Sequence, residues 1–411
     1  MRIVFFNRFF YPDISATSQM LSDLAFHLAE RVEVHVVTSE SKGGGALETV
    51  RGVTIHRVAP AASGPHTLVR RAWDYLRYYI GARAALRRIV GPGDIVVAKT
   101  DPPLLSVALG TLAKAKGASL VVWLQDLFPE VAAQYGIPAM GGALGERLRR
   151  GRDASLSLAD AVVAIGDRMA ARVLRSGGVS PGRIRVIHNW ADGESLVPLG
   201  NARNELRARW GLQDKFVVGY SGNLGRVHEF DTLLGAAARL RAEAGIAFLI
   251  VGAGPRLAQV RERAAAGGLA NIRFEPLQER DSLPQSLAIA DVHLSILRPE
   301  FEGLVVPSKL YGIMAVGRPA IFIGDPGGET GGILRAADAG LSVACGDDGG
   351  LAQAILRLRD APSERERLGA NARSAFEAKY EMRQAFAEWS SLLKEISPGY
   401  TSATATKSQA L

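Results

Sequence analysis

Cysteine is nearly missing from this chain. Among 411 residues Cys345 is the only one, which excludes an internal disulfide and any metal site built from several cysteines. The same scarcity fits a reducing compartment. The sequence also has no uninterrupted apolar run as long as a membrane-spanning helix. Its first apolar run is closed at once by Asn7 and Arg8, which is typical of a buried strand and not of a signal peptide.

The chain has no Asp-x-Asp motif, so we expect no metal site of that kind and no bound metal. Positive charge is in excess, with a net charge of +8 and a pI near 9.7. Such a balance permits nucleic acid, an anionic membrane or phosphate-bearing ligands, and composition alone does not choose among them. Nearly half of the residues are apolar, which is enough to bury two cores of ordinary size.

Apolar strands alternate with amphipathic helices in both halves of the chain. Ile3–Phe6 and Val32–Val37 have the pattern of buried parallel strands around one helix, and the same rhythm restarts at Phe216–Ser221. The fold class predicted is α/β, with two Rossmann-like domains, each containing a parallel sheet. We expect a first domain over 1–192, a linker over 193–205, a second domain over 206–380, a helix over 381–396 that returns to the first domain, and a disordered tail over 397–411.

The segment from Pro299 to Pro319 has the composition of a phosphate-binding turn. Two carboxylates precede a glycine and apolar residues, and Pro307 followed by Ser308 predicts a helix start. Free backbone N–H groups at such a start, with the Ser308 hydroxyl and Lys309, suit a diphosphate. The alternative is a buried helix with a serine cap. The candidate ligand-binding residues here are Glu300, Glu302, Gly303, Leu304, Val305, Ser308 and Lys309.

Two glycine-rich turns follow predicted strands of the second domain. One is Gly222-Asn-Leu-Gly225, with Arg226 directly after it, and the other is Gly252-Ala-Gly254. One short glycine turn is weak evidence for a phosphate site, but two in register with the segment above are stronger evidence. The candidate ligand-binding residues in these turns are Gly222, Asn223, Gly225, Arg226, Gly252 and Gly254.

Together these segments resemble the donor site of family-4 glycosyltransferases, and in particular the bacterial polysaccharide and colanic-acid assembly branch with a Val-Val-Pro-Ser-Lys-x-Tyr element. The resemblance implies the GT-B fold, in which two Rossmann-like domains face a central cleft. It also aligns Glu329 with a family acid near the nucleotide. The family's second glutamate would fall on Ser308 or Gly312, so its contact with the nucleotide ribose cannot be carried over.

Asp126 directly follows the predicted strand 118–124, and ligands of open α/β sheets gather at strand C-termini. The stretch Gln125–Glu130 resembles the family's Asp-Leu-aromatic-Pro-acid element, which faces the acceptor. The alternative is a carboxylate that caps its own loop. The loop after the first strand has no glycine, but Ser15 and Thr17 offer hydroxyl groups on this side.

Residues 68–90 combine Trp and Tyr with six arginines. This composition is typical of an interfacial helix on anionic lipid; the alternative is a packed helix with a solvated basic face. A second basic surface is expected over 141–157, where four arginines fall in a short helical stretch: Arg147, Arg149, Arg150 and Arg152.

The resemblance implies a retaining hexosyltransferase, and the missing Asp-x-Asp motif predicts that it is metal-independent. We expect no cofactor beyond its nucleoside diphosphate sugar. We expect catalysis by Asp126, Arg226 and Lys309. The acceptor expected is a saccharide linked to polyprenyl diphosphate, reached from the cytoplasmic face of the plasma membrane by peripheral association. The alternative is a non-catalytic sugar-nucleotide-binding subunit or scaffold. A nucleic-acid partner is not expected, because the arginines gather in helices of one domain without a recognition motif.

Overall fold

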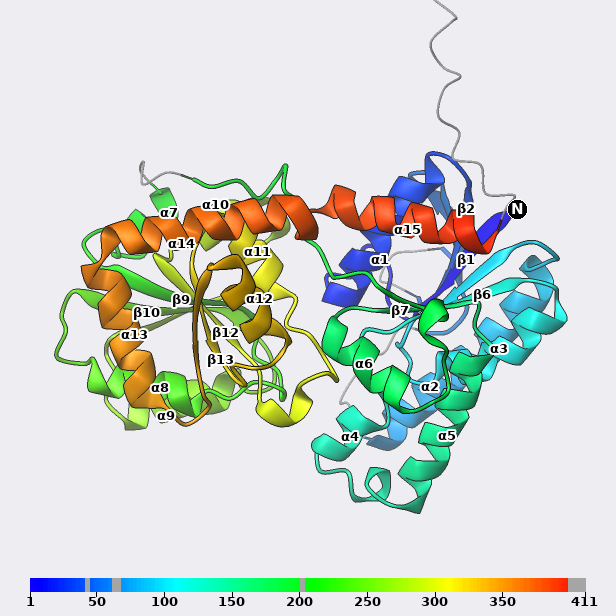
Figure 1. Cartoon of the computed structure of the whole chain (residues 1–411), viewed down its shortest axis with the longest axis horizontal. Helices are drawn as coiled ribbons and strands as arrows, with labels where there is room; N and C mark the ends of the chain where they lie inside the picture. The colour runs from blue at the N-terminus through cyan, green and yellow to red at the C-terminus, as the bar shows by residue number, and fades with distance from the viewer. Residues whose placement is uncertain (41–44, 61–67, 200–203, 398–411) are drawn as a thin grey trace, which may run out of the picture. The chain divides into compact units, whose positions relative to one another are not determined.

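The computed structural model of the protein describes residues 1–40, 45–60, 68–199 and 204–397. The chain divides into two compact units, shown in Figure 1. The first unit contains Met1–His188 together with the C-terminal helix from Phe386, and the second contains Asn189–Ala385. The predicted linker 193–205 therefore starts inside the second unit, where Arg373 Nη1 donates a hydrogen bond to the Leu196 carbonyl at 2.7 Å. The predicted tail lies outside the described residues, except for Ser397.

The first unit is built on an eight-stranded sheet in the order β3-β4-β2-β1-β5-β6-β7-β8. All neighbours are parallel except the β3–β4 hairpin. Strand β1 is central, and its buried Phe5 is in register with Val36 of β2 and Val97 of β5. The strands are β1 Arg2–Phe6, β2 Glu33–Thr38, β3 Leu47–Val50, β4 Val53–Arg57, β5 Ile95–Ala98, β6 Ser119–Trp123, β7 Ala161–Ala164 and β8 Ile184–Val186.

Helices follow most strands of this sheet, as the alternating pattern predicts. The last helix of the chain also packs here: the Trp389 ring meets the Trp123 ring edge-on, with centroids 4.7 Å apart, and Phe386 stacks on His27 at 4.5 Å. Both tryptophans are fully buried. The helices are α1 Ala16–Ala29, α2 Leu68–Ile89, α3 Leu105–Ala115, α4 Glu130–Gln134, α5 Ala143–Ser157, α6 Asp167–Arg175 and α15 Met382–Ile396, with 3-10 turns at Pro138–Met140 and Pro181–Arg183.

The second unit has a six-stranded, fully parallel sheet in the order β11-β10-β9-β12-β13-β14. The strand order reverses between β9 and β12, and open α/β sheets bind ligands outside the carboxyl ends of the strands at such a switch point. The strands are β9 Phe216–Asn223, β10 Ile246–Ala253, β11 Ile272–Glu275, β12 Val292–Ile296, β13 Ala320–Ile323 and β14 Gly340–Val343.

The core of this sheet is formed by Val218, Phe248, Ile250, Val292 and Leu294, packed against apolar residues of α8 and α13. Its helices are α7 Glu205–Arg209, α8 Asp231–Arg239, α9 Leu257–Ala266, α10 Leu283–Ala288, α11 Lys309–Ala315, α12 Glu329–Ala337, α13 Asp348–Asp360 and α14 Pro362–Ala375, with 3-10 turns at Arg280–Ser282 and Pro299–Phe301 and a π turn at Phe376–Tyr380. The predicted fold class, two Rossmann-like parallel-sheet domains, is confirmed. No helix of the described residues is both long and apolar enough to cross a membrane.

Candidate functional site

The switch point of the second unit brings the predicted donor residues to one edge of the sheet. The first glycine turn, Gly222–Gly225, lies at the end of β9, and the acidic segment from Pro299 follows β12. The two segments are tied together directly, because the Arg298 backbone N–H donates to the Val227 carbonyl at 2.9 Å. Residues predicted from separate motifs therefore converge where the topology favours a ligand.

Lys309, the first residue of α11, is partly buried and points its ammonium at Tyr220 on β9. Its Nζ donates a hydrogen bond to the Tyr220 hydroxyl at 2.5 Å and lies 3.9 Å from the centroid of the Tyr220 ring. Removal of the amine from water lowers the Lys309 pKa to about 7. Within the described ranges no carboxylate forms an ion pair with it, so a bound anion could compensate the charge of its protonated form.

Close approach of β9 and β10 explains the second glycine turn. A Cβ on Gly252 would lie 2.1 Å from the Gly222 carbonyl oxygen, so a side chain has no room there. Gly254 has a φ of +138°, and its Cβ would lie 2.4 Å from Asn223 Oδ1. The glycines thus let the two turns lie against each other, while Gly225 is buried within the first turn.

Arg226 and His228 follow the first glycine turn and differ in burial. Arg226 is exposed and has no hydrogen bond or ion pair among the residues that the structure describes, so its guanidinium can meet a ligand. His228 is buried, and its Nδ1 donates to the Ile296 carbonyl at 2.7 Å, since a carbonyl only accepts. Burial, with a further effect from Lys309, lowers the His228 pKa to about 3. His228 is therefore neutral at physiological pH and supplies no charge to a phosphate.

The acidic segment is largely structural. Glu302 Oε1 accepts a hydrogen bond at 2.6 Å from the backbone N–H of Glu329, the first residue of α12. Glu300 is exposed and forms an ion pair with Arg298. Gly303 has a φ of +70°, which allows the chain to turn back, Leu304 is buried and Val305 is half-buried. Glu329 itself is buried.

Ser308 is the N-cap residue of α11, as predicted, but its side chain makes no capping hydrogen bond. Its backbone lies in the helical region, φ −63° and ψ −20°, which does not present the hydroxyl to the N–H groups as an extended cap residue would. Helix α11 has only seven residues, so its dipole is a weak anion site. The Ser308 hydroxyl stays available to a ligand.

Two other helix starts at this edge carry carboxylates of the chain itself. Glu302 caps α12, and Glu229 accepts hydrogen bonds from the backbone N–H and the hydroxyl of Thr232 at the start of α8. A phosphate arriving at either helix start would meet a carboxylate already in place. Lys309 and Arg226 are therefore the better candidates to neutralise a diphosphate.

Asp126, predicted on the acceptor side, lies in the first unit just after β6. Burial raises its pKa to about 6, although a hydrogen bond with Thr100 opposes the shift. Its Oδ1 atom is buried and has no hydrogen-bond partner among the residues described. A carboxyl group with this environment can hold a proton near neutral pH or receive one from a bound hydroxyl group.

The loop before α1 uses the Ser15 hydroxyl hydrogen within the loop itself. The Ser15 hydroxyl donates to Asp13 Oδ1 at 2.5 Å, so its hydrogen is already used. Asp13 also adds negative charge beside it. The Ser15 oxygen can still accept a hydrogen bond, and its place on the acceptor side stays a prediction. The Thr17 carbonyl accepts a hydrogen bond from Lys99 Nζ at 3.1 Å.

Sequence reasoning missed Lys99 and Tyr220, which contact the predicted site residues Thr17 and Lys309. Lys99 is buried at the end of β5, with its Nζ 3.6 Å from the centroid of the Trp123 ring, and burial holds its pKa well below the ordinary value. A lysine directly after an apolar strand is the signal that could have pointed to it. Tyr220 gave no such signal, because a tyrosine within a strand is ordinary core.

Helix α2 has two different faces. On the inner face the Tyr78 hydroxyl donates to the Val37 carbonyl at 2.7 Å, and the Arg8 guanidinium lies 4.9 Å from the Tyr75 ring centroid. The outer face exposes large apolar side chains, with Trp73 58%, Leu76 43% and Ile80 62% exposed. They follow helical spacing, and exposed arginines flank them: Arg70, Arg71, Arg77, Arg87 and Arg88.

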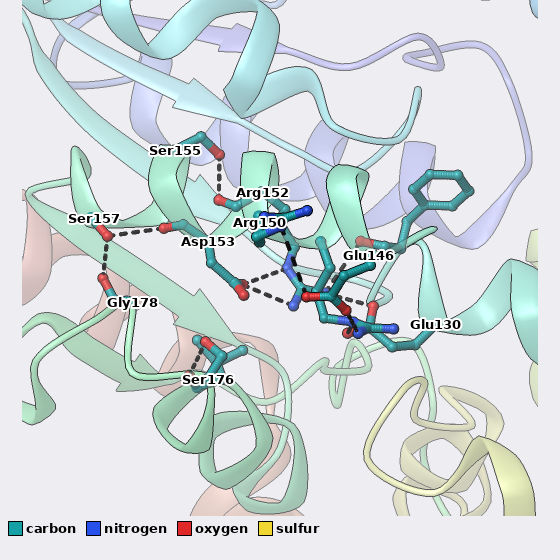
Figure 2. A network of polar contacts seen from close by, with 12 residues as sticks. Glu130, Glu146, Arg150, Arg152, Asp153, Ser155, Ser157, Ser176 and Gly178 are labelled. Carbon is teal, nitrogen blue, oxygen red and sulfur yellow. Dashed lines mark hydrogen bonds and ion pairs between the residues drawn. The ribbon is translucent and has the colours of Figure 1, made fainter. Parts of the chain in front are cut away.

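The expected second basic surface on α5 holds two exposed arginines, while the other two, Arg149 and Arg152, are paired with carboxylates (Figure 2). Arg152 is buried and pairs with Glu130 at 2.6 Å and with Asp153 at 2.8 Å. Arg149 pairs with Glu130 at 3.3 Å and with Glu146. These arginines face carboxylates of α4 and α5 because a buried guanidinium needs an anionic partner. Arg147 and Arg150 are exposed, and Arg150 Nε lies 4.0 Å from Glu146.

Comparison with known protein families assigns both halves of the chain. Residues 16–190 match the glycosyl transferase 4-like domain, and residues 202–375 match the glycosyl transferases group 1 domain. The chain therefore pairs a glycosyl transferase 4-like domain with a group 1 domain, and its fold is GT-B.

Two relatives are named as glycosyltransferases. WcaI of Escherichia coli K12, named as a colanic acid biosynthesis glycosyl transferase, is 33% identical over 54% of this chain and 54% of its own length. WbjE of Pseudomonas aeruginosa, named as a glycosyltransferase, is 29% identical over 64% of this chain and 65% of its own. The chain thus spans between half and two thirds of the length of these relatives.

Among solved structures, Anabaena HepE in complex with UDP superposes with a TM-score of 0.73 at 16% identity, covering 96% of this chain and all of that one. At 16% identity, this structural similarity shows that the two proteins share a fold.

Proposed function

We propose that the protein is a glycosyltransferase that moves a sugar from a nucleoside diphosphate sugar to a saccharide acceptor in the synthesis of a surface polysaccharide. The observation that carries the proposal is the partly buried Lys309 ammonium at the β9–β12 switch point, which has no carboxylate partner among the described residues. A diphosphate is the anion that such a position would receive. The HepE complex with UDP and the role named for WcaI support this choice of ligand and pathway class.

In the proposed reaction the bond between the anomeric carbon and the diphosphate oxygen breaks, and a new bond to the acceptor oxygen forms. The leaving diphosphate gains negative charge, which Lys309 and Arg226 would neutralise. The acceptor hydroxyl loses its proton, and Asp126 would orient that hydroxyl or receive the proton. We propose retention of the anomeric configuration, as the family resemblance implies, and charge neutralisation by protein cations instead of a metal ion.

The acceptor we propose is a saccharide linked to polyprenyl diphosphate, met at an anionic membrane surface. The outer face of α2 supports this. Its exposed Trp73, Leu76 and Ile80 supply an apolar stripe, and the flanking arginines supply charge complementary to anionic headgroups. Helix α5 contributes little to this surface, because Arg149 and Arg152 are paired with carboxylates.

A non-catalytic sugar-nucleotide-binding subunit is the second candidate. Ser308 and Gly312 stand where the family pattern has its second glutamate, which favours altered donor handling. Both candidates bind a nucleoside diphosphate, so only transfer of sugar to an acceptor separates them.

Thermal-shift measurements with UDP, GDP and ADP test the ligand class. A ligand that binds only the folded state raises the apparent stability, so at least one of these should raise the Tm of the wild type. The same ligand should raise the Tm of Lys309→Met much less. No shift with any nucleoside diphosphate would contradict the proposal.

A further inference from the structure

The Tyr220 side chain, near the end of β9, makes several contacts that fix its orientation. It is buried, its hydroxyl donates to the Asn223 carbonyl at 2.8 Å, and its ring meets the Phe230 ring edge-on at 5.2 Å between centroids. The His228 ring lies edge-on at 6.2 Å. Because the hydroxyl hydrogen is directed at a carbonyl, the lone pairs of the Tyr220 oxygen remain for Lys309. The orientation of the tyrosine is thus fixed by contacts that do not involve the lysine.

Lys309 makes two contacts with this tyrosine. Its Nζ lies 2.5 Å from the hydroxyl oxygen and 3.9 Å from the centroid of the ring. Both contacts suit an ammonium group, but neither carries a full negative charge. Among the described residues, the titratable groups seen to interact with the amine are Tyr220 and the neutral His228. The surroundings can hold the amine in place without fixing its charge.

We propose that Tyr220 is a positioning residue that holds the Lys309 amine ready for a diphosphate, so that a nucleoside diphosphate binds with uptake of a proton by Lys309. The inference rests on the proposed function and deepens it. In the empty site the lysine has neutral partners, and the arriving diphosphate supplies the missing negative charge. An opposite charge at this distance stabilises the protonated amine, and the proton comes from the buffer.

The Lys309 pKa of about 7 sets the pH at which this uptake is measurable. At pH 8 most of the free enzyme would carry a neutral lysine, and the complex would carry a charged one. Uptake should therefore approach one proton per bound nucleoside diphosphate at pH 8 and fall toward zero near pH 6. Affinity should weaken as the pH rises above 7.

Isothermal titration calorimetry with UDP, GDP or ADP at pH 8 tests this, using two buffers with different enthalpies of ionisation. The expected result is a binding enthalpy that differs between the two buffers by nearly the full difference between their enthalpies of ionisation. Lys309→Arg is the matched control, because a guanidinium stays charged: its binding enthalpy should be the same in both buffers. Tyr220→Phe keeps the ring and removes the hydroxyl, so the pH at which affinity falls should move downward while the Tm stays near that of the wild type.

The outcomes separate the two proposals. Binding with equal enthalpies in both buffers would overturn the proton uptake and leave the proposed function standing. A Tyr220→Phe variant with the pH profile of the wild type would overturn the role of Tyr220. Failure of all three nucleoside diphosphates to bind the wild type would overturn the proposed function and this inference together.

Discussion

The Glu302 side chain is hydrogen-bonded to the backbone of Glu329 in the second unit: Glu302 Oε1 accepts a hydrogen bond from the Glu329 N–H at 2.6 Å. Space is tight around this bond, because a Cβ on Gly328 would lie 2.4 Å from Glu302 Oε2. The acidic segment that suggested a sugar-nucleotide site therefore also fixes the start of α12. A carboxylate at a helix start is favourable by its hydrogen bond and by the helix dipole.

Glu302→Gln should lower the stability of the second unit by about 1 kcal/mol, since the amide keeps an acceptor but loses the charge. Glu300→Gln is the matched control two residues away. Its carboxylate is exposed and pairs with Arg298, so its loss should change stability by about 0.5 kcal/mol or less. Urea unfolding measures both. Equal losses would show that Glu302 does not cap α12.

Asp126→Asn should make the protein more stable above pH 6 while it lowers transfer. Burial raises the Asp126 pKa from 3.8 to about 6, so the folded state binds this proton more tightly than the unfolded state. The protonated Asp126 carboxyl contributes its full stabilisation below about pH 4, and this stabilisation is lost as the pH rises through 6. Asparagine carries no charge, and at pH 7.5 we expect a gain of about 1–3 kcal/mol.

Asp160→Asn is the control for this experiment. The Asp160 carboxylate accepts the Leu120 backbone N–H at 2.7 Å and pairs with Lys114, so its replacement should lower stability and leave transfer intact. Denaturant melts at pH 5 and pH 7.5, with transfer rates beside them, compare the two variants. A loss of stability in Asp126→Asn at pH 7.5 would make Asp126 a structural residue.

Much of the fold was predictable, because buried parallel strands leave continuous apolar runs such as Ile95–Ala98. The β3 strand was missed: its residues Leu47–Val50 are half exposed and pair only with β4, so they show no apolar run. The convergence of the Gly222 turn with Lys309 was predictable from motif order and strand topology. The partner of Lys309 was not, because a contact between residues 89 positions apart leaves no local pattern.

Charge was the least predictable property of the site. The α5 arginines formed a basic stretch in the sequence, yet Arg152 is buried beside Glu130, which lies 22 positions away. Ser15 offered a hydroxyl, yet Asp13 takes its hydrogen. In both cases a carboxylate sets the surroundings of the side chain. The tertiary fold brings Glu130 to Arg152, and the conformation of the loop brings Asp13 to Ser15.

The outer face of α2 should bind anionic vesicles through two separable contributions. Arg71→Glu with Arg77→Glu should weaken binding by reversing charge, since each basic residue near such a surface contributes on the order of 1 kcal/mol. Trp73→Ser with Ile80→Ser should remove the apolar contribution, which salt does not screen. Sedimentation with phosphatidylglycerol vesicles at low and high salt measures both. Binding to the wild type should weaken with salt without vanishing.

Arg150→Glu on α5 is the matched control, since Arg150 is also exposed but has Glu146 beside it. Its vesicle binding should stay close to that of the wild type. Equal sedimentation with neutral phosphatidylcholine vesicles would show that charge does not drive docking. No sedimentation with either vesicle would make α2 an ordinary solvated helix.

Trp389→Ala should destabilise the first unit by about 3–5 kcal/mol, the usual cost of emptying a buried tryptophan site. The Trp389 ring is fully buried against Trp123, so the loss should detach α15 from its sheet. Hydrogen exchange would show this as faster exchange in α15 than in α13 of the second unit. Protection of α15 unchanged from the wild type would contradict the packing described.

The central claim is that Lys309 carries the charge of the leaving diphosphate during sugar transfer. Its most direct test is the rate at which labelled sugar passes from a nucleotide sugar into a lipid-extractable acceptor, measured for the wild type and for Lys309→Met at saturating donor. The nucleotide is the one that raises the Tm most. We predict that Lys309→Met folds normally and transfers roughly 30- to 1,000-fold more slowly, equivalent to about 2–4 kcal/mol of transition-state stabilisation. Transfer by Lys309→Met at the wild-type rate would contradict the claim.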